Sequence, residues 1–385
     1  MAKQICFLLD WYPTRTNNGC VFAKHLICAI ADMGYECVVI APRPIHKSNF
    51  QKANQVSYFR EEKTAKGRKI RIYMPWYLHL TSRKQTMGIS MDNHYRAVLR
   101  TIRKEGLKPD VVYGHFIYQC GLTAARIGEK LGIPSYCACG ENSLRLEKGS
   151  MPYATGMKHH DWKTILEKLS GIVCVSGNNE RLLRENGFIS EAMRTGVFPN
   201  GVDEEKFHVV DRTTCRRQLG LSEDAFIVVY TGAFTANKGV DRLNMALKTC
   251  ENVYAIFLGQ GPLEPDCDRI LYKGRVANDD VVKYLNAADI FVLPTRGEGC
   301  CNAIVEALSC GLPIISSDLA FNDDILNKEN SLRIDVENVE QIRDSILRLY
   351  RDSELRKHLA EGAAKSAERL GIRSRARRIL DFMEL

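Results

Sequence analysis

Two glutamates in the C-terminal third have a spacing that suits binding of a nucleotide. Glu298 lies in a short glycine-bearing loop, and Glu306 follows eight residues later. An apolar strand pattern at 289–294 precedes the loop, and apolar residues at helical spacing follow it until Gly311 and Pro313. We expect the two carboxylates to bind hydroxyl groups on either side of a bound pyrophosphate.

The predicted helix begins where its free N–H groups can bind that pyrophosphate. The N–H groups of Cys301, Asn302 and Ala303 have no partner within such a helix, and the helix dipole favours a negative charge there. Lys238 opens another predicted helix after a strand at 225–232, where its ammonium is a point charge for a phosphate. The alternative to a nucleotide site is a buried strand–loop–helix unit in which the two glutamates are simply solvated.

Three motifs carry a resemblance to a known family. Glu298 and Glu306 with the closing Ala-Leu-Ser-Cys-Gly-Leu-Pro, the pair Lys238-Gly239, and Pro-Asn-Gly-Val-Asp at 199–203 resemble retaining glycosyltransferase family 4 of the bacterial surface-polysaccharide type. The resemblance covers nearly the whole chain. It implies the α/β GT-B fold, in which two Rossmann-like parallel-sheet domains face each other across a cleft. It also implies retaining transfer of a sugar from a nucleotide diphosphate sugar.

The resemblance also implies roles for single residues. Lys238 would bind the donor phosphates, Glu298 the donor sugar, Glu306 the ribose, and the backbone around Val276 would border the base. His115, after a predicted strand, would lie at the transfer site, so that the expected catalytic residues are His115, Lys238 and Glu298. The expected donor contacts are Gly19, Lys238, Val276, Glu298, Gly299, Cys300, Cys301, Asn302, Ala303 and Glu306.

The chain departs from the family pattern at two positions. Ala233 stands where an arginine frequently follows the strand glycine, and Cys139 stands where many relatives have the histidine of His-Gly-x-Asp. Glu141 and Asn142, which follow Cys139, are the expected acceptor-side contacts. A catalytically silent nucleotide-sugar-binding subunit is therefore an alternative, as is a GT-B epimerase or phosphorylase.

Length and pattern predict two domains. The chain has 385 residues, more than one ordinary core holds. The predicted N-terminal, acceptor-binding domain covers 1–196 and begins with a strand–helix–strand pattern. Its loop lacks GxGxxG, so the usual dinucleotide fingerprint is not expected. The predicted nucleotide-sugar-binding domain covers 197–365, and a terminal helix at 366–385 is expected to cross back to the first domain.

The cysteines do not predict a metal site. Among 14 cysteines there is no CxxC pair, and Cys137-x-Cys139 and Cys300-Cys301 lack zinc-ligand spacing. We therefore expect no metal and no cofactor, and a metal-independent enzyme. The absence of a long apolar run and of a signal-like N-terminus predicts a cytoplasmic protein.

Positive charge is concentrated in the N-terminal half. The net charge is +8, yet 43–110 alone holds 16 Lys and Arg against 5 Asp and Glu, a surplus of 11, so the remainder carries −3. Such a segment suits the surface of an anionic inner membrane or an acceptor carrying a pyrophosphate. A solvated basic face is equally compatible, and no motif for nucleic-acid binding accompanies the charge.

The resemblance implies a glycosyltransferase, for which we expect a UDP-sugar donor in preference to a GDP-sugar. The expected acceptor is a hydroxyl of a glycan or lipid-linked saccharide, in capsule, exopolysaccharide or cell-wall polysaccharide synthesis. A free sugar, a small metabolite and a protein hydroxyl are alternative acceptors.

Overall fold

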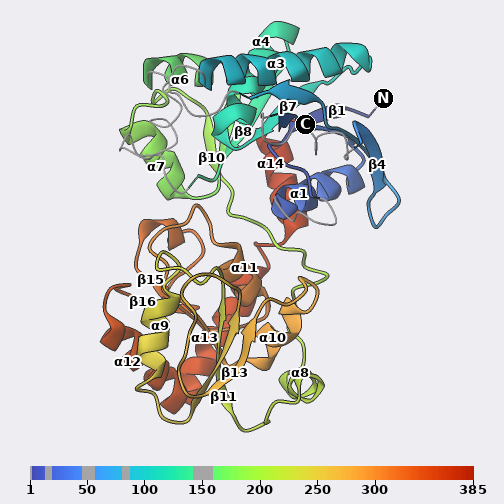
Figure 1. The fold of residues 1–385 in the computed structure, drawn as a ribbon. Coiled ribbons are helices and arrows are strands. Elements are labelled where there is room, and N and C mark those ends of the chain that lie inside the picture. The colour runs from blue at the N-terminus through green and yellow to red at the C-terminus, as the bar shows by residue number, and fades with distance from the viewer. Residues whose placement is uncertain (1, 14–19, 46–56, 80–86, 142–158) are drawn as a thin grey trace. The chain divides into compact units, whose positions relative to one another are not determined.

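The computed structural model describes residues 2–13, 20–45, 57–79, 87–141 and 159–385. The chain divides into two compact units (Figure 1). Unit 1 contains Met1–Phe198 and Arg375–Leu385, and unit 2 contains Pro199–Ser374. Each unit is described by itself below.

Unit 1 is built on an eight-stranded sheet with the order β10-β9-β8-β7-β1-β2-β5-β4. All neighbouring strands are parallel except β4 and β5, which form an antiparallel edge. The strands are β1 Gln4–Leu8, β2 Glu36–Ile40, β4 Phe59–Lys63, β5 Lys69–Tyr73, β7 Val111–His115, β8 Ser135–Cys139, β9 Gly171–Cys174 and β10 Thr195–Val197. Two short strands, β3 Arg43–Ile45 and β6 Trp76–Leu78, form a separate parallel pair.

Helices cover both faces of this sheet, with α3 and α4 on one face and α1 and α14 on the other (Figure 1). The helical segments of unit 1 are α1 Val21–Asp32, α3 Met87–Lys104, η1 Ile117–Gly121, α4 Leu122–Leu131, α6 His159–Leu166, α7 Gly177–Glu185 and most of α14 Ile372–Phe382. Strands buried on both faces read as nearly continuous apolar runs, and β1 accordingly continues after Gln4 as Ile-Cys-Phe-Leu. Its Cys6 and Leu8 belong to the core beneath α3 and α4.

Unit 2 is built on a six-stranded parallel sheet with the order β13-β12-β11-β14-β15-β16. The strands are β11 Phe226–Thr231, β12 Val253–Leu258, β13 Ile270–Gly274, β14 Ile290–Leu293, β15 Ile314–Ser317 and β16 Ser331–Ile334. The helical segments are α8 Arg212–Leu219, α9 Val240–Leu247, α10 Val281–Ala287, α11 Asn302–Ser309, η2 Ala320–Asn322, α12 Val339–Arg351 and α13 Ser353–Ala367. Helix α9 packs against α12, α10 against α8, and α11 against α13.

Both sheets reverse their strand order at one point, which is where open parallel sheets bind ligands. In unit 2 the reversal lies between β11 and β14, and in unit 1 it lies between β1 and β7. The loops that leave the carboxyl ends of these four strands are therefore the places to look for a site.

The division into units differs from the predicted one near the C-terminus. The first boundary lies between Phe198 and Pro199, two residues beyond the predicted position. Residues 366–374, which were assigned to the returning helix, belong to unit 2. Two hydrogen bonds explain this: Val202 N donates to Leu370 O at 2.9 Å, and Ile372 N donates to Val202 O at 2.8 Å. Only Arg375–Leu385 joins unit 1, where Phe382 packs against Tyr136 and Phe198.

Candidate active site

The loops after β11 and β14 cross closely at the reversal point of unit 2. Gly239, the residue before α9, has φ 76°, and a Cβ atom there would lie 2.2 Å from the carbonyl oxygen of Pro294. Arg296 N donates to Asn237 O at 2.8 Å, and Thr295 Oγ1 donates to the same oxygen at 3.2 Å. A side chain at position 239 would separate the two loops, so the crossing requires glycine.

This crossing brings two of the predicted catalytic residues together. Lys238 Nζ donates to Glu298 Oε1 in an ion pair, and Thr295 Oγ1 donates to the same carboxylate oxygen at 3.2 Å. The Glu298 side chain is 10% exposed and that of Lys238 27%. The structure therefore holds a paired ammonium and carboxylate at the carboxyl ends of neighbouring strands β11 and β14.

A buried arginine supports the crossing from behind. Arg242 is 3% exposed, and its guanidinium donates to Ala236 O at 2.9 Å and to Pro294 O at 2.8 Å. These two carbonyls belong to the two loops that cross. The sequence prediction did not include Arg242. Arg242 lies four residues after Lys238, about one helical turn further along the chain. The sequence signal that could have identified Arg242 is a charged residue on the apolar face of α9.

Helix α11 begins at the predicted place. Its N-cap residue is Cys301, which has extended backbone angles and makes no side-chain cap, so this end of the helix is open in that respect. Asn200 fixes the start of this helix, because its Nδ2 donates to Cys300 O at 3.0 Å and to Asn302 Oδ1 at 2.9 Å. The sequence analysis includes Asn200 only in a motif of the family resemblance and does not predict this contact.

Glu306 lies one turn inside α11 and is partly buried. Burial raises the pKa of its carboxyl group to about 7, and the nearby Lys206 ammonium opposes this effect. Within the part of the chain that the structure describes, its carboxylate has no hydrogen-bond or ion-pair partner. A partly buried carboxylate without a partner favours a ligand that donates hydrogen bonds to it.

The remaining predicted donor residues of unit 2 lie around the same edge of the sheet. Gly299, Cys300 and Ala303 belong to the loop and first turn that contain Glu298 and the start of α11. Val276 follows β13, whose neighbour β12 separates it from β11. Gly19 in unit 1 lies outside the described residues.

In unit 1, His115 ends β7 and is 4% exposed. Its ring packs against Phe22 and Phe116, with centroids 5.1 Å and 4.9 Å apart. Burial, with a smaller effect of the Arg375 charge, lowers the pKa of His115 to about 3. The imidazole is therefore neutral at pH 7 and can take part in hydrogen bonds without carrying a charge.

Glu141, a predicted acceptor-side contact, binds the backbone of unit 1. Its carboxylate accepts hydrogen bonds from Ile117 N and from Gly140 N, the latter at 2.9 Å, and its carbonyl oxygen accepts from Asn179 Nδ2 at 2.8 Å. Burial raises the pKa of this carboxyl group. Asn142 lies outside the described residues.

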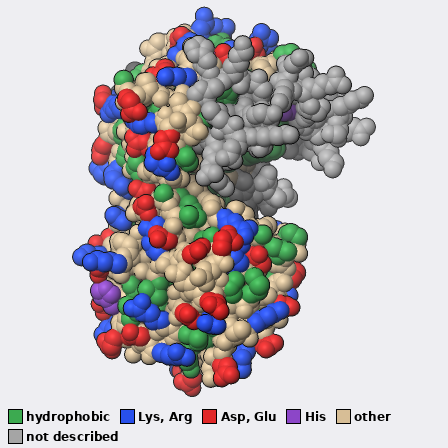
Figure 2. All heavy atoms as spheres, turned by 90° about the vertical axis from the view of Figure 1, so that its left-hand side faces the viewer, with side chains coloured by type: hydrophobic (Ala, Val, Ile, Leu, Met, Phe, Trp, Pro, Cys, Tyr) green, Lys and Arg blue, Asp and Glu red, His purple; other side chains and the backbone are tan. Residues whose placement is uncertain are grey.

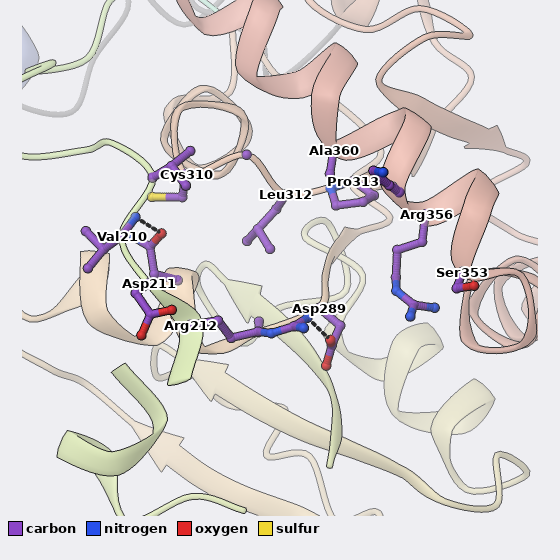
Figure 3. Close-up of a pocket in the computed structure, with 15 residues that line it drawn as sticks. Val210, Asp211, Arg212, Asp289, Cys310, Leu312, Pro313, Ser353, Arg356 and Ala360 are labelled. Atoms are coloured by element: carbon purple, nitrogen blue, oxygen red, sulfur yellow. Dashed lines mark hydrogen bonds and ion pairs between the residues drawn. The ribbon is translucent and has the colours of Figure 1, made fainter. Parts of the chain in front are cut away.

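A cavity of about 510 Å³ in unit 2 lies away from these residues (Figure 3). Its lining includes Asp289 and Pro313, which precede β14 and β15, so that it opens at the amino ends of these strands. The ion pair between Arg212 and Asp289 closes one side (Figure 3). None of the predicted donor residues lines it, and we do not assign it to the candidate site.

Exposed arginines of α3 contribute to the basic character of unit 1. Arg96, Arg100 and Arg103 lie at helical spacing and are exposed. Other cations of the basic segment are paired, such as Lys69 with Glu61 and Arg71 with Glu36. On the face drawn in Figure 2, Lys and Arg are interspersed with Asp and Glu outside the grey residues.

Comparison with known proteins identifies the family. The family described as Glycosyltransferase Family 4 matches residues 21–206, and the family described as Glycosyl transferases group 1 matches residues 225–352. The chain belongs to glycosyltransferase family 4. It is a glycosyltransferase, and its two matched segments correspond to units 1 and 2.

Relatives of this family 4 glycosyltransferase include proteins of surface-polymer synthesis. TuaC of Bacillus subtilis (strain 168), a glycosyltransferase assigned to teichuronic acid biosynthesis, is 26% identical over 359 residues, covering 90% of this chain and 88% of TuaC. The UDP-Gal:alpha-D-GlcNAc-diphosphoundecaprenol alpha-1,3-galactosyltransferase of Escherichia coli is 26% identical over 205 residues, 48% of this chain and 52% of that enzyme.

Solved structures show the fold of the family 4 chain. Sucrose-phosphate synthase from Thermosynechococcus elongatus matches with a TM-score of 0.78 at 16% identity, covering 99% of this chain and 98% of that chain. Alr3699/HepE of Anabaena, in complex with UDP, matches with a TM-score of 0.71 at 15% identity, covering 99% of both chains. The fold class is GT-B, as the sequence predicted. No helix among the described residues is both long and apolar enough to cross a bilayer.

Replacing Arg242 with Met should loosen the loop crossing. The carbonyls of Ala236 and Pro294 would lose their buried donors, at a cost of about 2 kcal/mol. We expect the amides of Lys238 and Gly239, which donate to Thr235 O, to exchange hydrogen about 30-fold faster. Hydrogen–deuterium exchange measures this change.

Arg269→Met is the matched control, because Arg269 is exposed in the same unit. It should leave the exchange of these amides unchanged. Equal exchange rates in the Arg242 variant and the wild type would show that the guanidinium does not hold the loops together.

Proposed function

We propose that this protein transfers a sugar, with retention of configuration, from a nucleotide diphosphate sugar to a hydroxyl of a glycan or lipid-linked saccharide in polysaccharide biosynthesis. The observation that carries the proposal is the convergence of Lys238, Glu298 and the open N-terminus of α11 at the reversal point of the unit 2 sheet. A cation and a set of free N–H groups there suit a diphosphate, and a carboxylate beside them suits sugar hydroxyls.

The chemical demand of this reaction is the departure of a nucleoside diphosphate, which gains negative charge as the glycosidic bond breaks. Lys238 and the N–H groups at the start of α11 would stabilise that charge, each donor typically contributing about 3 kcal/mol. In the structure Lys238 is paired with Glu298. A bound donor would place its phosphates against the ammonium and its sugar hydroxyls against the carboxylate, so each group would exchange one partner for another.

Glu306 would accept hydrogen bonds from the two ribose hydroxyls. The loop at Val276 would border the base. Because charge stabilisation comes from these groups, the proposal includes no metal ion at the diphosphate.

Proton transfer is assigned to the departing phosphate. With a pKa of about 3, His115 is a weak base at neutral pH. We propose that His115 positions the sugar or acceptor by a neutral hydrogen bond. The acceptor hydroxyl would attack on the face of the leaving group and pass its proton to a phosphate oxygen. Glu298 then acts as a positioning group.

A UDP-sugar is the favoured donor. The Escherichia coli relative is named for UDP-Gal and a diphosphoundecaprenol acceptor, and the Anabaena structure contains UDP. The test is a thermal-shift screen with UDP, GDP, ADP and their sugars, in which a selective shift identifies the base. Release of UDP that depends on an added saccharide acceptor supports transfer. Conversion of the donor without an acceptor would instead identify an epimerase.

Replacing Lys238 with Ala should lower kcat by about 100-fold, because the ammonium would stabilise charge that develops mainly as the bond breaks. Steady-state kinetics with the donor found in the screen measure the change. Lys248→Ala, a surface variant at the end of α9, should retain full activity. Wild-type turnover of the Lys238 variant would remove this lysine from the mechanism.

Donor affinity should depend on pH through Glu306. The carboxylate must be ionised to accept ribose hydroxyls, and its pKa in the free protein is about 7. Affinity should therefore rise about 10-fold per pH unit below pH 7 and level off above it. Glu306→Gln should bind more weakly with a flat profile, as measured by calorimetry with the nucleotide sugar, whose diphosphate does not titrate in this range.

The same group predicts a change in stability. A carboxyl whose pKa is raised on folding makes the folded state lose stability as pH increases from its unfolded pKa of about 4.5 to about 7. Glu306→Gln should therefore raise the Tm at pH 8 and leave it nearly unchanged at pH 4.5. The exposed variant Glu340→Gln should change neither profile. A pH-dependent affinity that persists in Glu306→Gln would contradict the assignment.

We further propose that unit 1 contacts an anionic membrane surface through Arg96, Arg100 and Arg103. Each cation near such a surface contributes about 1 kcal/mol, so replacing all three with Gln should weaken vesicle binding about 100-fold. Co-sedimentation with phosphatidylglycerol vesicles at low salt measures this. Gln at the exposed Lys328, Arg351 and Lys365 of unit 2 is the charge-matched control. Equal loss in both variants would indicate non-specific attraction.

A further inference from the structure

Three side chains with metal-ligating chemistry meet in unit 1. Asp10 follows β1, Cys120 lies in η1 after β7, and His94 projects from α3. One ligand atom from each residue lies within 4.8 Å of the others. Since β1 and β7 flank the point where strand order reverses, the group lies at the edge of the sheet that favours ligand binding.

His94 offers a nitrogen that has no partner among the described residues. The residue is 1% exposed, its Nδ1 lies 2.8 Å from Thr123 Oγ1, and within the described part of the chain its buried Nε2 has no hydrogen-bond partner. A buried polar atom without a partner costs about 1–3 kcal/mol. In metal-binding histidines, a hydrogen bond typically fixes one ring nitrogen and leaves the other nitrogen free to bind the metal. Thr123 Oγ1 is placed to make such a bond to Nδ1 of His94.

Asp10 and Cys120 supply the other two ligand atoms. Cys120 Sγ donates to Asp10 Oδ1 at 3.2 Å. Within the described part of the chain no Lys or Arg forms an ion pair with Asp10, so its carboxylate has no cation to balance it. Burying a carboxylate beside a thiol is costly unless a positive charge joins them.

The backbone after β7 is bent to bring Cys120 to this position. Phe116 and Gln119 have left-handed φ angles of 70° and 56°, each costing about 1–3 kcal/mol. The loop that contains Cys120 passes close to Gly114, where a Cβ atom would lie 2.5 Å from Cys120 O. Only glycine leaves room for this approach. Glu141 holds the loop through Ile117 N.

We propose that Asp10, His94 and Cys120 bind one divalent metal ion, with zinc the best match. A carboxylate oxygen, an imidazole nitrogen and a thiolate are the three ligand types that zinc takes, and tetrahedral zinc ligands lie about 3.5 Å apart. Cys120 Sγ and Asp10 Oδ1 already have nearly this separation. The longest distance between ligand atoms in the cluster, which is within 4.8 Å, would shorten by about 1 Å when the metal binds. Cys120 would release its thiol proton on binding, and a water molecule would supply the fourth ligand.

This site is separate from the proposed donor site, which lies in unit 2 and requires no metal at the diphosphate. The two proposals therefore fail independently. The test uses full-length protein stripped of metal and titrated with Co²⁺, which substitutes for zinc and gives a charge-transfer band in the near ultraviolet only when a thiolate binds it. We expect one Co²⁺ per chain, displaced by one Zn²⁺, and a raised Tm with Zn²⁺.

Cys120→Ser should abolish the charge-transfer band and lower Zn²⁺ affinity by at least about 100-fold. Cys250→Ser, at a buried free cysteine of unit 2, should retain both. Asp10→Asn provides a second variant in case Cys120→Ser does not fold, and it should weaken Zn²⁺ binding while the residual Co²⁺ complex keeps the band. Absence of stoichiometric metal at micromolar concentration, or a full band in Cys120→Ser, would overturn the proposal.

Discussion

The contact between Lys238 and Glu298 depends on a close crossing of two loops. Gly239 allows the loop after β11 to approach Pro294 O, and Arg242 donates to a carbonyl of each loop from the protein interior. Buried carbonyls need donors, so the arginine satisfies both loops with one side chain. Because the loops are held in this way, Lys238 and Glu298 are brought into contact although 60 residues separate them.

The ion pair between Lys238 and Glu298 has a consequence for the free enzyme. It keeps the ammonium and the carboxylate in place, and any ligand that binds either group must replace this interaction. Preorganised charges reduce the reorganisation needed during the reaction. The N-terminus of α11 adds N–H donors, since its N-cap residue Cys301 makes no side-chain cap.

The two reversal points carry different electrostatics. Unit 2 presents a lysine and helix N–H groups, which suit an anion. In unit 1, burial lowers the pKa of His115, whose neutral ring suits a neutral hydroxyl, and raises the pKa of Asp10, whose carboxylate would be stabilised by a cation. The physical cause is desolvation, whereas Lys238 and Glu298 neutralise each other.

The sequence by itself determined the fold class, through its family motifs, and the strand–loop–helix segment around Glu298 and Glu306, because that segment is a local pattern. Glu298, Glu306 and the start of α11 lie within one strand–loop–helix segment, where spacing fixes geometry. The contacts of Arg242 and Asn200, and the cluster of Asp10, His94 and Cys120, join segments that are distant along the chain. A local pattern marks Arg242 only as a charged residue on an apolar helix face and does not give its partners. The end of unit 2 was likewise decided by two hydrogen bonds to Val202. Only the tertiary structure could bring these groups together, because hydrogen bonding and burial between distant segments follow from packing.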